Sequence, residues 1–124
     1  MLALRGDLGA GKSVLARAIA RGAGVAAAMP SPTFNLVFRY DAHAGTVWHL
    51  DLYRLQHEDD VWELGWRELG AEGDLVLIEW PERAERLLPE HRWDIRLESA
   101  SAPSLRTVMA ERRGRAKLLP PRAQ

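Results

Sequence analysis

The sequence predicts an α/β fold in which helices cover both faces of a mixed parallel and antiparallel sheet, giving three layers. Three observations predict this fold. A glycine-rich loop joins a short apolar run to a helical pattern near the start of the chain, which is typical of a strand followed by a helix. A continuous apolar run at 75–78 is typical of a central strand buried on both faces. Two pairs of strand-like segments separated by turn residues predict hairpins, so some strands are antiparallel.

The first half of the chain is expected to contain three strands and one helix. The apolar run at 2–4 ends near a glycine, as a buried strand does where it leads into a loop. From 12 to about 21, apolar residues recur at helical spacing, and Gly22 and Gly24 follow as stop signals. Two prolines predict a loop over 29–33, followed by a hairpin with strands over 34–40 and 46–53 and a five-residue turn over 41–45.

The second half is expected to continue with short helices and three strands. A short helix is predicted from 58 to about 67, with three acidic residues at its positive end and with Trp62 and Trp66 on one face. The central strand at 75–78 follows, and then one or two helical turns over 82–88. Two strands that pair with each other are expected over 93–98 and 105–111.

Composition excludes several classes of function. The 124 residues carry 17 basic and 17 acidic side chains, so no surplus of charge draws the chain to nucleic acid or to an anionic membrane. The absence of cysteine excludes disulfides and thiolate zinc sites. No apolar run approaches the ~20 residues needed to span a bilayer, and the first residues lack a signal-peptide pattern, so a cytoplasmic protein is expected.

The glycine-rich loop satisfies the pattern G-x-x-x-x-G-K-[ST] of a phosphate-binding P-loop. Its glycines let successive backbone N–H groups point inward at phosphate oxygens. Lys12 supplies a cation to the β- and γ-phosphates, Ser13 a hydroxyl to Mg²⁺, and the following helix its positive end. The residues predicted to hold a nucleoside triphosphate are Gly6, Asp7, Leu8, Gly9, Ala10, Gly11, Lys12 and Ser13.

Such a site needs a carboxylate opposite the phosphates to organise the magnesium ion. Glu79 directly follows the apolar run 75–78, and a carboxylate there is costly unless it faces an ion or a water-filled cleft. We interpret Glu79 as a magnesium-side residue; the alternative is a plain charge at the end of a strand. Asp51 is the second candidate, and its spacing leaves three roles open: organising magnesium-bound water, positioning the attacking water, or pairing with Arg54.

Other side chains near these motifs have open roles. Thr33 is placed like the mobile threonine that senses a γ-phosphate, although a threonine that caps a turn fits the same spacing. For Trp80 the alternatives are stacking on a base, contacting a partner protein and filling the core. The histidines show no metal-ligand spacing and are interpreted as surface or core residues: His43, His49, His57 and His91.

Four motifs together resemble the TsaE family, also called YjeE. Each motif alone indicates little beyond a phosphate loop, but their order and spacing match across roughly residues 2–98. The motifs are Gly6-Asp7-Leu8-Gly9-Ala10-Gly11-Lys12-Ser13, Ser31-Pro32-Thr33-Phe34, His49-Leu50-Asp51-Leu52-Tyr53-Arg54-Leu55 and Ile78-Glu79-Trp80-Pro81-Glu82.

The resemblance implies a function in tRNA modification. Members of the family are bacterial ATPases that are needed to make N6-threonylcarbamoyladenosine in tRNA together with TsaB and TsaD. This chain is therefore expected to bind ATP with Mg²⁺, to dock on the TsaB–TsaD complex and to support its turnover by hydrolysing ATP. TsaD performs the carbamoyl transfer, and contact with tRNA is expected to be indirect. The chain is expected to form one P-loop ATPase domain over 1–112, followed by a flexible tail over 113–124.

The resemblance also implies roles for single residues. The loop from Asp7 to Ser13 would hold the phosphates, and Ser13 and Glu79 would hold Mg²⁺. Lys12, Asp51, Glu79 and Thr33 are the implied catalytic residues. Trp80 would lie near the nucleotide, and Arg106 is the nearest match to an arginine of the C-terminal strands that lines the site.

The sequence departs from the family in two places. Ser13 stands where the family usually has threonine, which keeps the hydroxyl. Relatives carry about one more strand and one more helix before the P-loop strand, so the resemblance implies a domain that is truncated at its N-terminus. Either the given chain is a fragment or has a misplaced start, or the protein has a more open base pocket.

Three other functions are alternatives. A small-molecule or nucleotide kinase needs an acceptor pocket and an arginine-bearing lid, and no insertion supplies one. A GTPase usually needs an Asn-Lys-x-Asp block, but Asn35 is the only asparagine of the chain. A non-catalytic, ATP-dependent assembly module is the third alternative.

Overall fold

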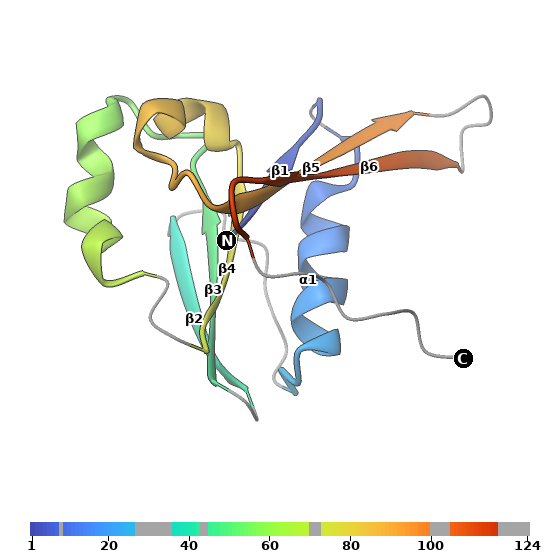
Figure 1. Ribbon diagram of the computed structural model, residues 1–124, viewed down its shortest axis with the longest axis horizontal. Helices are drawn as coiled ribbons and strands as arrows, with labels where there is room; N and C mark the ends of the chain where they lie inside the picture. Colours follow the sequence, from blue (N-terminus) through green and yellow to red (C-terminus); the bar gives the residue numbers. More distant parts are fainter. Residues whose placement is uncertain (8, 27–35, 43–44, 70–72, 100–104, 117–124) are drawn as a thin grey trace.

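The computed structural model describes residues 1–7, 9–26, 36–42, 45–69, 73–99 and 105–116 (Figure 1). Among the described residues, no helix has both the length and the apolar character needed to cross a membrane. The strands are β1 (Leu2–Arg5), β2 (Val37–Ala42), β3 (Gly45–Asp51), β4 (Leu75–Glu79), β5 (Arg92–Ser99) and β6 (Arg106–Arg113). The helices are α1 (Lys12–Gly22) and the 3-10 segments η1 (Glu58–Leu64), η2 (Trp66–Glu68) and η3 (Pro81–Leu87).

The strands form one six-stranded mixed sheet in the order β2-β3-β4-β1-β5-β6. The four inner strands are parallel, whereas β2 and β6 each run antiparallel to their neighbour at the two edges. Both predicted hairpins are thus confirmed. Because the inner strands are parallel, their carboxyl ends meet at one edge, where ligands bind in open α/β sheets. In register, Glu79 at the end of β4 lies beside Leu4 of β1 on one side and Asp51 of β3 on the other.

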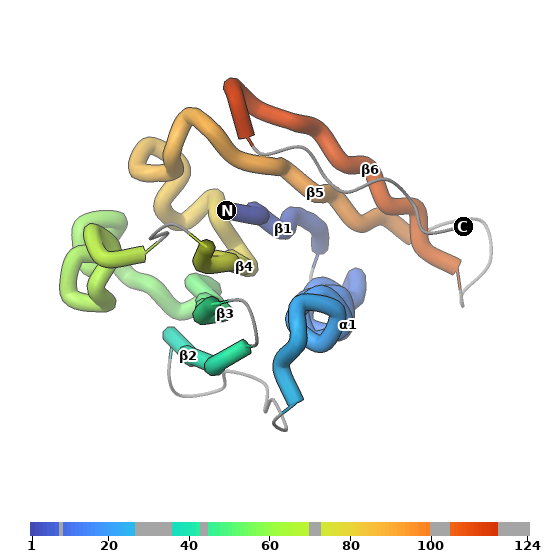
Figure 2. The backbone as a smooth tube through the Cα atoms, turned by 60° about the horizontal axis from the view of Figure 1, so that its bottom comes forward, coloured from blue at the N-terminus to red at the C-terminus, as the bar shows by residue number. Residues whose placement is uncertain are grey.

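The sheet separates two apolar cores, which confirms the predicted three layers. Helix α1 lies over one face of the sheet (Figure 2). On that face, Ala16 and Ala20 of α1 belong to one core with Leu77 of β4 and the apolar residues of β1 and β5. On the other face, Val76 and Ile78 of β4 pack against the residues of η1, η2 and η3. Since successive residues of β4 face opposite cores, its continuous apolar run is explained by burial on both sides.

The turn between β2 and β3 is shorter than predicted. Asp41 pairs with Thr46 and Ala42 with Gly45, so the ladder includes three residues that were assigned to a five-residue turn. Only residues 43–44, which lie outside the described residues, separate the two strands. The turn preference of Asp41 and Gly45 is overridden by backbone pairing with the opposite strand.

The predicted helix over 58–67 is replaced by η1 and η2. Gly65 separates them in a left-handed conformation with φ 82°. A 3-10 helix has three residues per turn, so residues four apart do not share a face. Trp66 is accordingly buried, while Trp62 is 44% exposed, and the prediction that they share one face is wrong.

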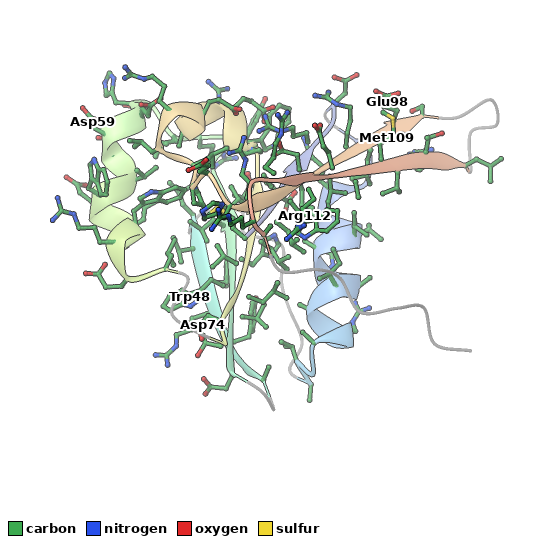
Figure 3. The ribbon with its side chains drawn as sticks, in the orientation of Figure 1. Trp48, Asp59, Asp74, Glu98, Met109 and Arg112 are labelled. Atoms are coloured by element: carbon green, nitrogen blue, oxygen red, sulfur yellow. The ribbon has the colours of Figure 1, made fainter. Side chains whose placement is uncertain are left out.

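Asp74 joins β3 and β4 at the end of the sheet that lies away from the loop between β1 and α1. Its carboxylate accepts hydrogen bonds from Trp48 Nε1 at 3.1 Å and from the backbone N–H of Thr46 at 3.2 Å (Figure 3). These bonds attach the start of β3 to the residue that precedes β4. They fix the register that brings Asp51 beside Glu79 at the other end.

Asp94 of β5 gathers three arginines on the face of the sheet opposite α1. It accepts bonds from Arg92 Nε at 3.1 Å, Arg113 Nε at 2.9 Å and Arg5 at 3.1 Å, and Arg5 also pairs with Glu85 of η3. Burial alone raises the pKa of Asp94, but the three guanidinium groups outweigh it and hold the pKa below its ordinary value. The cluster therefore joins β1, β5 and β6 through one charged carboxylate.

We expect Asp94→Asn to lower the free energy of unfolding at pH 7 by about 2 kcal/mol, because two partly buried arginines and one exposed arginine lose their counter-charge. A depressed pKa gives stability that is complete above the ordinary carboxyl range and is lost as the pH falls through the native value. The gap in the free energy of unfolding between wild type and variant should thus narrow as the pH falls below the ordinary carboxyl pKa of about 3.9. Denaturant unfolding at pH 7 and over a series of pH values below that pKa measures the gap. Glu98→Gln, at an exposed carboxylate near the end of the same strand (Figure 3), is the control; equal loss in both variants would contradict the account.

Candidate functional site

The described residues of the loop between β1 and α1 include three glycines with positive φ angles. Gly9 and Gly11 have φ angles of 82° and 98°, in the left-handed region that favours glycine. At Gly6 a Cβ atom would approach the carbonyl oxygen of Leu97 to 2.7 Å, so no larger residue fits there. A turn closes where the N–H of Ala10 donates to the carbonyl of Asp7 at 3.0 Å. Leu8, predicted to be part of the cradle, lies outside the described residues.

Helix α1 begins at Lys12 and presents its amino end to this loop. Gly11 is the N-cap residue, and no side chain caps the first turn. The unsatisfied N–H groups and the positive pole of a helix attract an anion at such a position. The loop and the helix together thus direct backbone N–H groups and the positive pole of α1 to the same end of the sheet.

Lys12 is buried within this site, with a side chain that is 5% exposed. Its Nζ donates to the carbonyl of Gly6 and lies 3.3 Å from the centre of the Trp80 ring. Burial lowers the pKa of Lys12, although the nearby carboxylates of Glu82 and Glu79 oppose the shift. The ammonium is held between a loop carbonyl and an aromatic face.

A chain of hydrogen bonds links the start of α1 to the interior of the sheet. Ser13 Oγ donates to Glu79 Oε1 at 2.8 Å, and Glu79 Oε2 lies 2.6 Å from His49 Nε2. Glu79 is 2% exposed and His49 is 1% exposed. The sequence interpretation of His49 as a surface or core residue missed this contact. The available signal was its position two residues before Asp51 on a strand beside Glu79.

Asp51 lies beside Glu79 in the β3–β4 register. Both residues line a cavity that Lys12 and Ser13 also line. Burial raises the pKa of Asp51 and the charge of Glu79 adds to the effect, while a hydrogen bond from the N–H of Tyr53 at 3.0 Å opposes it. The cavity has a volume of about 350 Å³ and is lined mainly by residues of the loop, α1 and the ends of β3 and β4. Two neighbouring carboxylates thus face one cationic side chain there.

Trp80 covers this cavity from the end of β4. It is the only described non-glycine residue with a positive φ angle, 57°, and this conformation turns the chain from β4 into η3. Its ring packs against Tyr53 with 4.9 Å between ring centres. Trp80 is only partly buried and its ring lies over Lys12, so it does more than fill the core.

Arg106, at the start of β6, contacts the loop between β1 and α1. Its Nε donates to the carbonyl of Ala10 at 3.2 Å, although Arg106 is 96 residues away in the sequence. It also lines a groove with Val14 of α1 and Leu97 of β5. The structure therefore brings Lys12, Ser13, Asp51, Glu79 and Trp80 to one cavity and places Arg106 against the loop. Thr33 lies outside the described residues.

Ser13 and Glu79 fit a magnesium ion by their chemistry. Mg²⁺ prefers oxygen ligands and is usually held by one or two carboxylates together with phosphate oxygens and water. Within the part of the chain that the structure describes, no three His, Cys, Asp or Glu side chains are grouped to hold a metal ion alone. A magnesium ion held by Ser13 and Glu79 would take its remaining oxygen ligands from water or from a phosphate.

Comparisons with known proteins agree on one family. A family model described as threonylcarbamoyl adenosine biosynthesis protein TsaE matches residues 1–108. A TsaE protein from Rickettsia conorii is 42% identical over 77% of this chain and 55% of the relative, and one from Haemophilus influenzae is 39% identical over 73% and 57%. The crystal structure of Bacillus subtilis YdiB superposes with a TM-score of 0.62 at 26% identity, over 90% of this chain and 66% of that one. The chain spans little more than half the length of the first two relatives.

Proposed function

Since the chain belongs to the TsaE family of tRNA threonylcarbamoyladenosine biosynthesis proteins, we propose that it binds ATP with Mg²⁺ and hydrolyses the nucleotide in support of this modification. The observation that carries the proposal is the meeting of Lys12, Ser13 and Glu79 at the amino end of α1. A cation, a hydroxyl and a carboxylate at a helix amino end are the groups that a magnesium-bound triphosphate requires.

Each group has a distinct proposed role. The N–H groups of the loop and the Lys12 ammonium would bind the β- and γ-phosphates, and Ser13 with Glu79 would hold Mg²⁺. The ion, when bound, would neutralise charge on the phosphates. Asp51 would orient the attacking water beside Glu79, and Trp80 with Tyr53 would shield the cavity from solvent. Thr33 remains a predicted γ-phosphate sensor, and Arg106 a residue that supports the loop beside the nucleotide.

The proposed partner is the TsaB–TsaD complex, and contact with tRNA is proposed to be indirect. The chain has as many acidic as basic residues, so it lacks the charge surplus by which a protein attracts nucleic acid. The test is phosphate release from ATP, measured with the chain alone, with TsaB–TsaD, and with small-molecule acceptors. Release that rises with TsaB–TsaD supports the proposal. Release that rises only with acceptors indicates a kinase, and no release in any mixture indicates a non-catalytic module.

We expect Asp51→Asn to leave ATP binding near normal and to slow hydrolysis by roughly 10²-fold or more, because water is no longer oriented by a carboxylate. Since burial raises the pKa of Asp51, the charged form is disfavoured and the neutral amide should not lower the melting temperature. Single-turnover hydrolysis and calorimetric ATP binding separate the two effects. Asp59→Asn, at an exposed carboxylate of η1 (Figure 3), is the matched control. Unchanged hydrolysis in Asp51→Asn would reduce Asp51 to a structural residue.

A further inference from the structure

His49 is buried beside the site without facing the nucleotide cavity. Its ring is 1% exposed, and its Nε2 lies 2.6 Å from Glu79 Oε2. The lining of the cavity includes Asp51 and Glu79 but not His49 among the described residues. Among the described residues, the hydrogen bond between His49 and this site is made with the carboxylate of Glu79.

The β3–β4 register explains how the ring reaches Glu79. His49 pairs with Leu77, two residues before Glu79, and paired residues of parallel strands point to the same face. Leu77 faces the core that contains α1, so His49 and Glu79 also point toward α1. Glu79 is therefore placed between the imidazole on one side and Ser13 on the other.

The two oxygens of Glu79 are divided between these neighbours. Oε2 is occupied by His49 Nε2, and Oε1 accepts from Ser13 Oγ at 2.8 Å. A buried carboxylate oxygen without a donor is costly, and a glutamate with one oxygen free can rotate about its terminal torsion. A fixed donor on Oε2 removes that freedom and leaves Oε1 directed at Ser13.

We infer that His49 is a positioning residue: by binding Oε2 of Glu79, it directs Oε1 toward the place between Ser13 and the phosphates where a magnesium ion is held. This inference rests on the proposed function. Groups that orient metal ligands from behind raise metal affinity about 10–100-fold in other proteins. His49 acts through Glu79 and does not touch the nucleotide.

The test compares His49→Gln with His49→Met in the full chain. Glutamine places an N–H donor at the same reach as Nε2, whereas methionine has similar length and volume without a donor. ATP binding is measured by calorimetry over a range of MgCl₂ concentrations and in EDTA. With His49→Met, the Mg²⁺ concentration at half-maximal effect should rise about 10-fold or more, while ATP affinity in EDTA stays unchanged. His49→Gln should restore most of the Mg²⁺ response.

Two results would overturn the inference: a normal Mg²⁺ response in His49→Met, or equal impairment in both variants. A second pair tests the route through Glu79, because His49→Met should have no further effect in a Glu79→Ala background. An undiminished effect there would also overturn it. Melting temperatures identify any variant that fails to fold, and His49→Asn, whose donor stops short of Oε2, then replaces His49→Met. If wild-type ATP binding ignores Mg²⁺, the proposed function fails instead.

Discussion

Lys12→Ala should lower the affinity for Mg-ATP by roughly 100-fold or more. The ammonium is expected to make at least two charge-assisted bonds to phosphate oxygens, each contributing about 1.5–3 kcal/mol. The fold should survive, because burial lowers the pKa of Lys12 and so opposes its charged form. Removing this cation takes away a binding group and leaves the core of the domain in place.

Calorimetric titration with Mg-ATP measures this effect, and thermal melting verifies the fold. Arg21→Ala is the matched control, since Arg21 is an exposed cation in the last turn of the same helix. It removes the same charge from the chain at the other end of α1. An affinity of Lys12→Ala within about threefold of the control would contradict the assignment of the loop as a phosphate cradle.

Glu79→Ala should slow Mg²⁺-dependent ATP hydrolysis by roughly 10²-fold or more, measured with TsaB–TsaD present. The variant loses one of two proposed magnesium ligands and leaves the Ser13 hydroxyl without its acceptor. ATP binding in EDTA should change much less, because the loop, Lys12 and the end of α1 are intact. The loss is thus expected in turnover and in the Mg²⁺ response more than in binding itself.

The control for Glu79 is Glu82→Ala. Glu82 is an exposed carboxylate three residues further along that also acts on the charge of Lys12. If both variants lose hydrolysis equally, the effect comes from general charge near Lys12 and the magnesium role of Glu79 is wrong. Equal hydrolysis in Glu79→Ala and wild type would contradict that role outright.

The elements that the sequence predicted well are those whose pattern is local. The continuous apolar run predicts the buried strand β4, and the helical spacing of apolar residues predicts α1. The spacing of glycines and lysine predicts the loop between β1 and α1. Glu79 could be singled out for the same reason, since it directly follows a buried run. The family motifs add only order and spacing to these local signals.

The features that the sequence missed depend on contacts between distant segments. The bond from His49 to Glu79 needs the parallel register of β3 and β4, which no local pattern encodes. The position of Trp80 over Lys12 depends on the left-handed backbone conformation of Trp80 itself, directly after β4. The prediction that Trp62 and Trp66 share one face assumed a continuous α-helix, and Gly65 interrupts the helix between them. For His49 and Trp80, tertiary geometry rather than residue preference decides the outcome.

The most direct test of the central claim is an equilibrium titration of the folded wild-type chain with ATP, in the presence of TsaB–TsaD and with Mg²⁺ or EDTA. The account predicts saturable binding of one ATP per chain that Mg²⁺ strengthens. A folded chain that takes up no ATP at millimolar concentration in either buffer would contradict it.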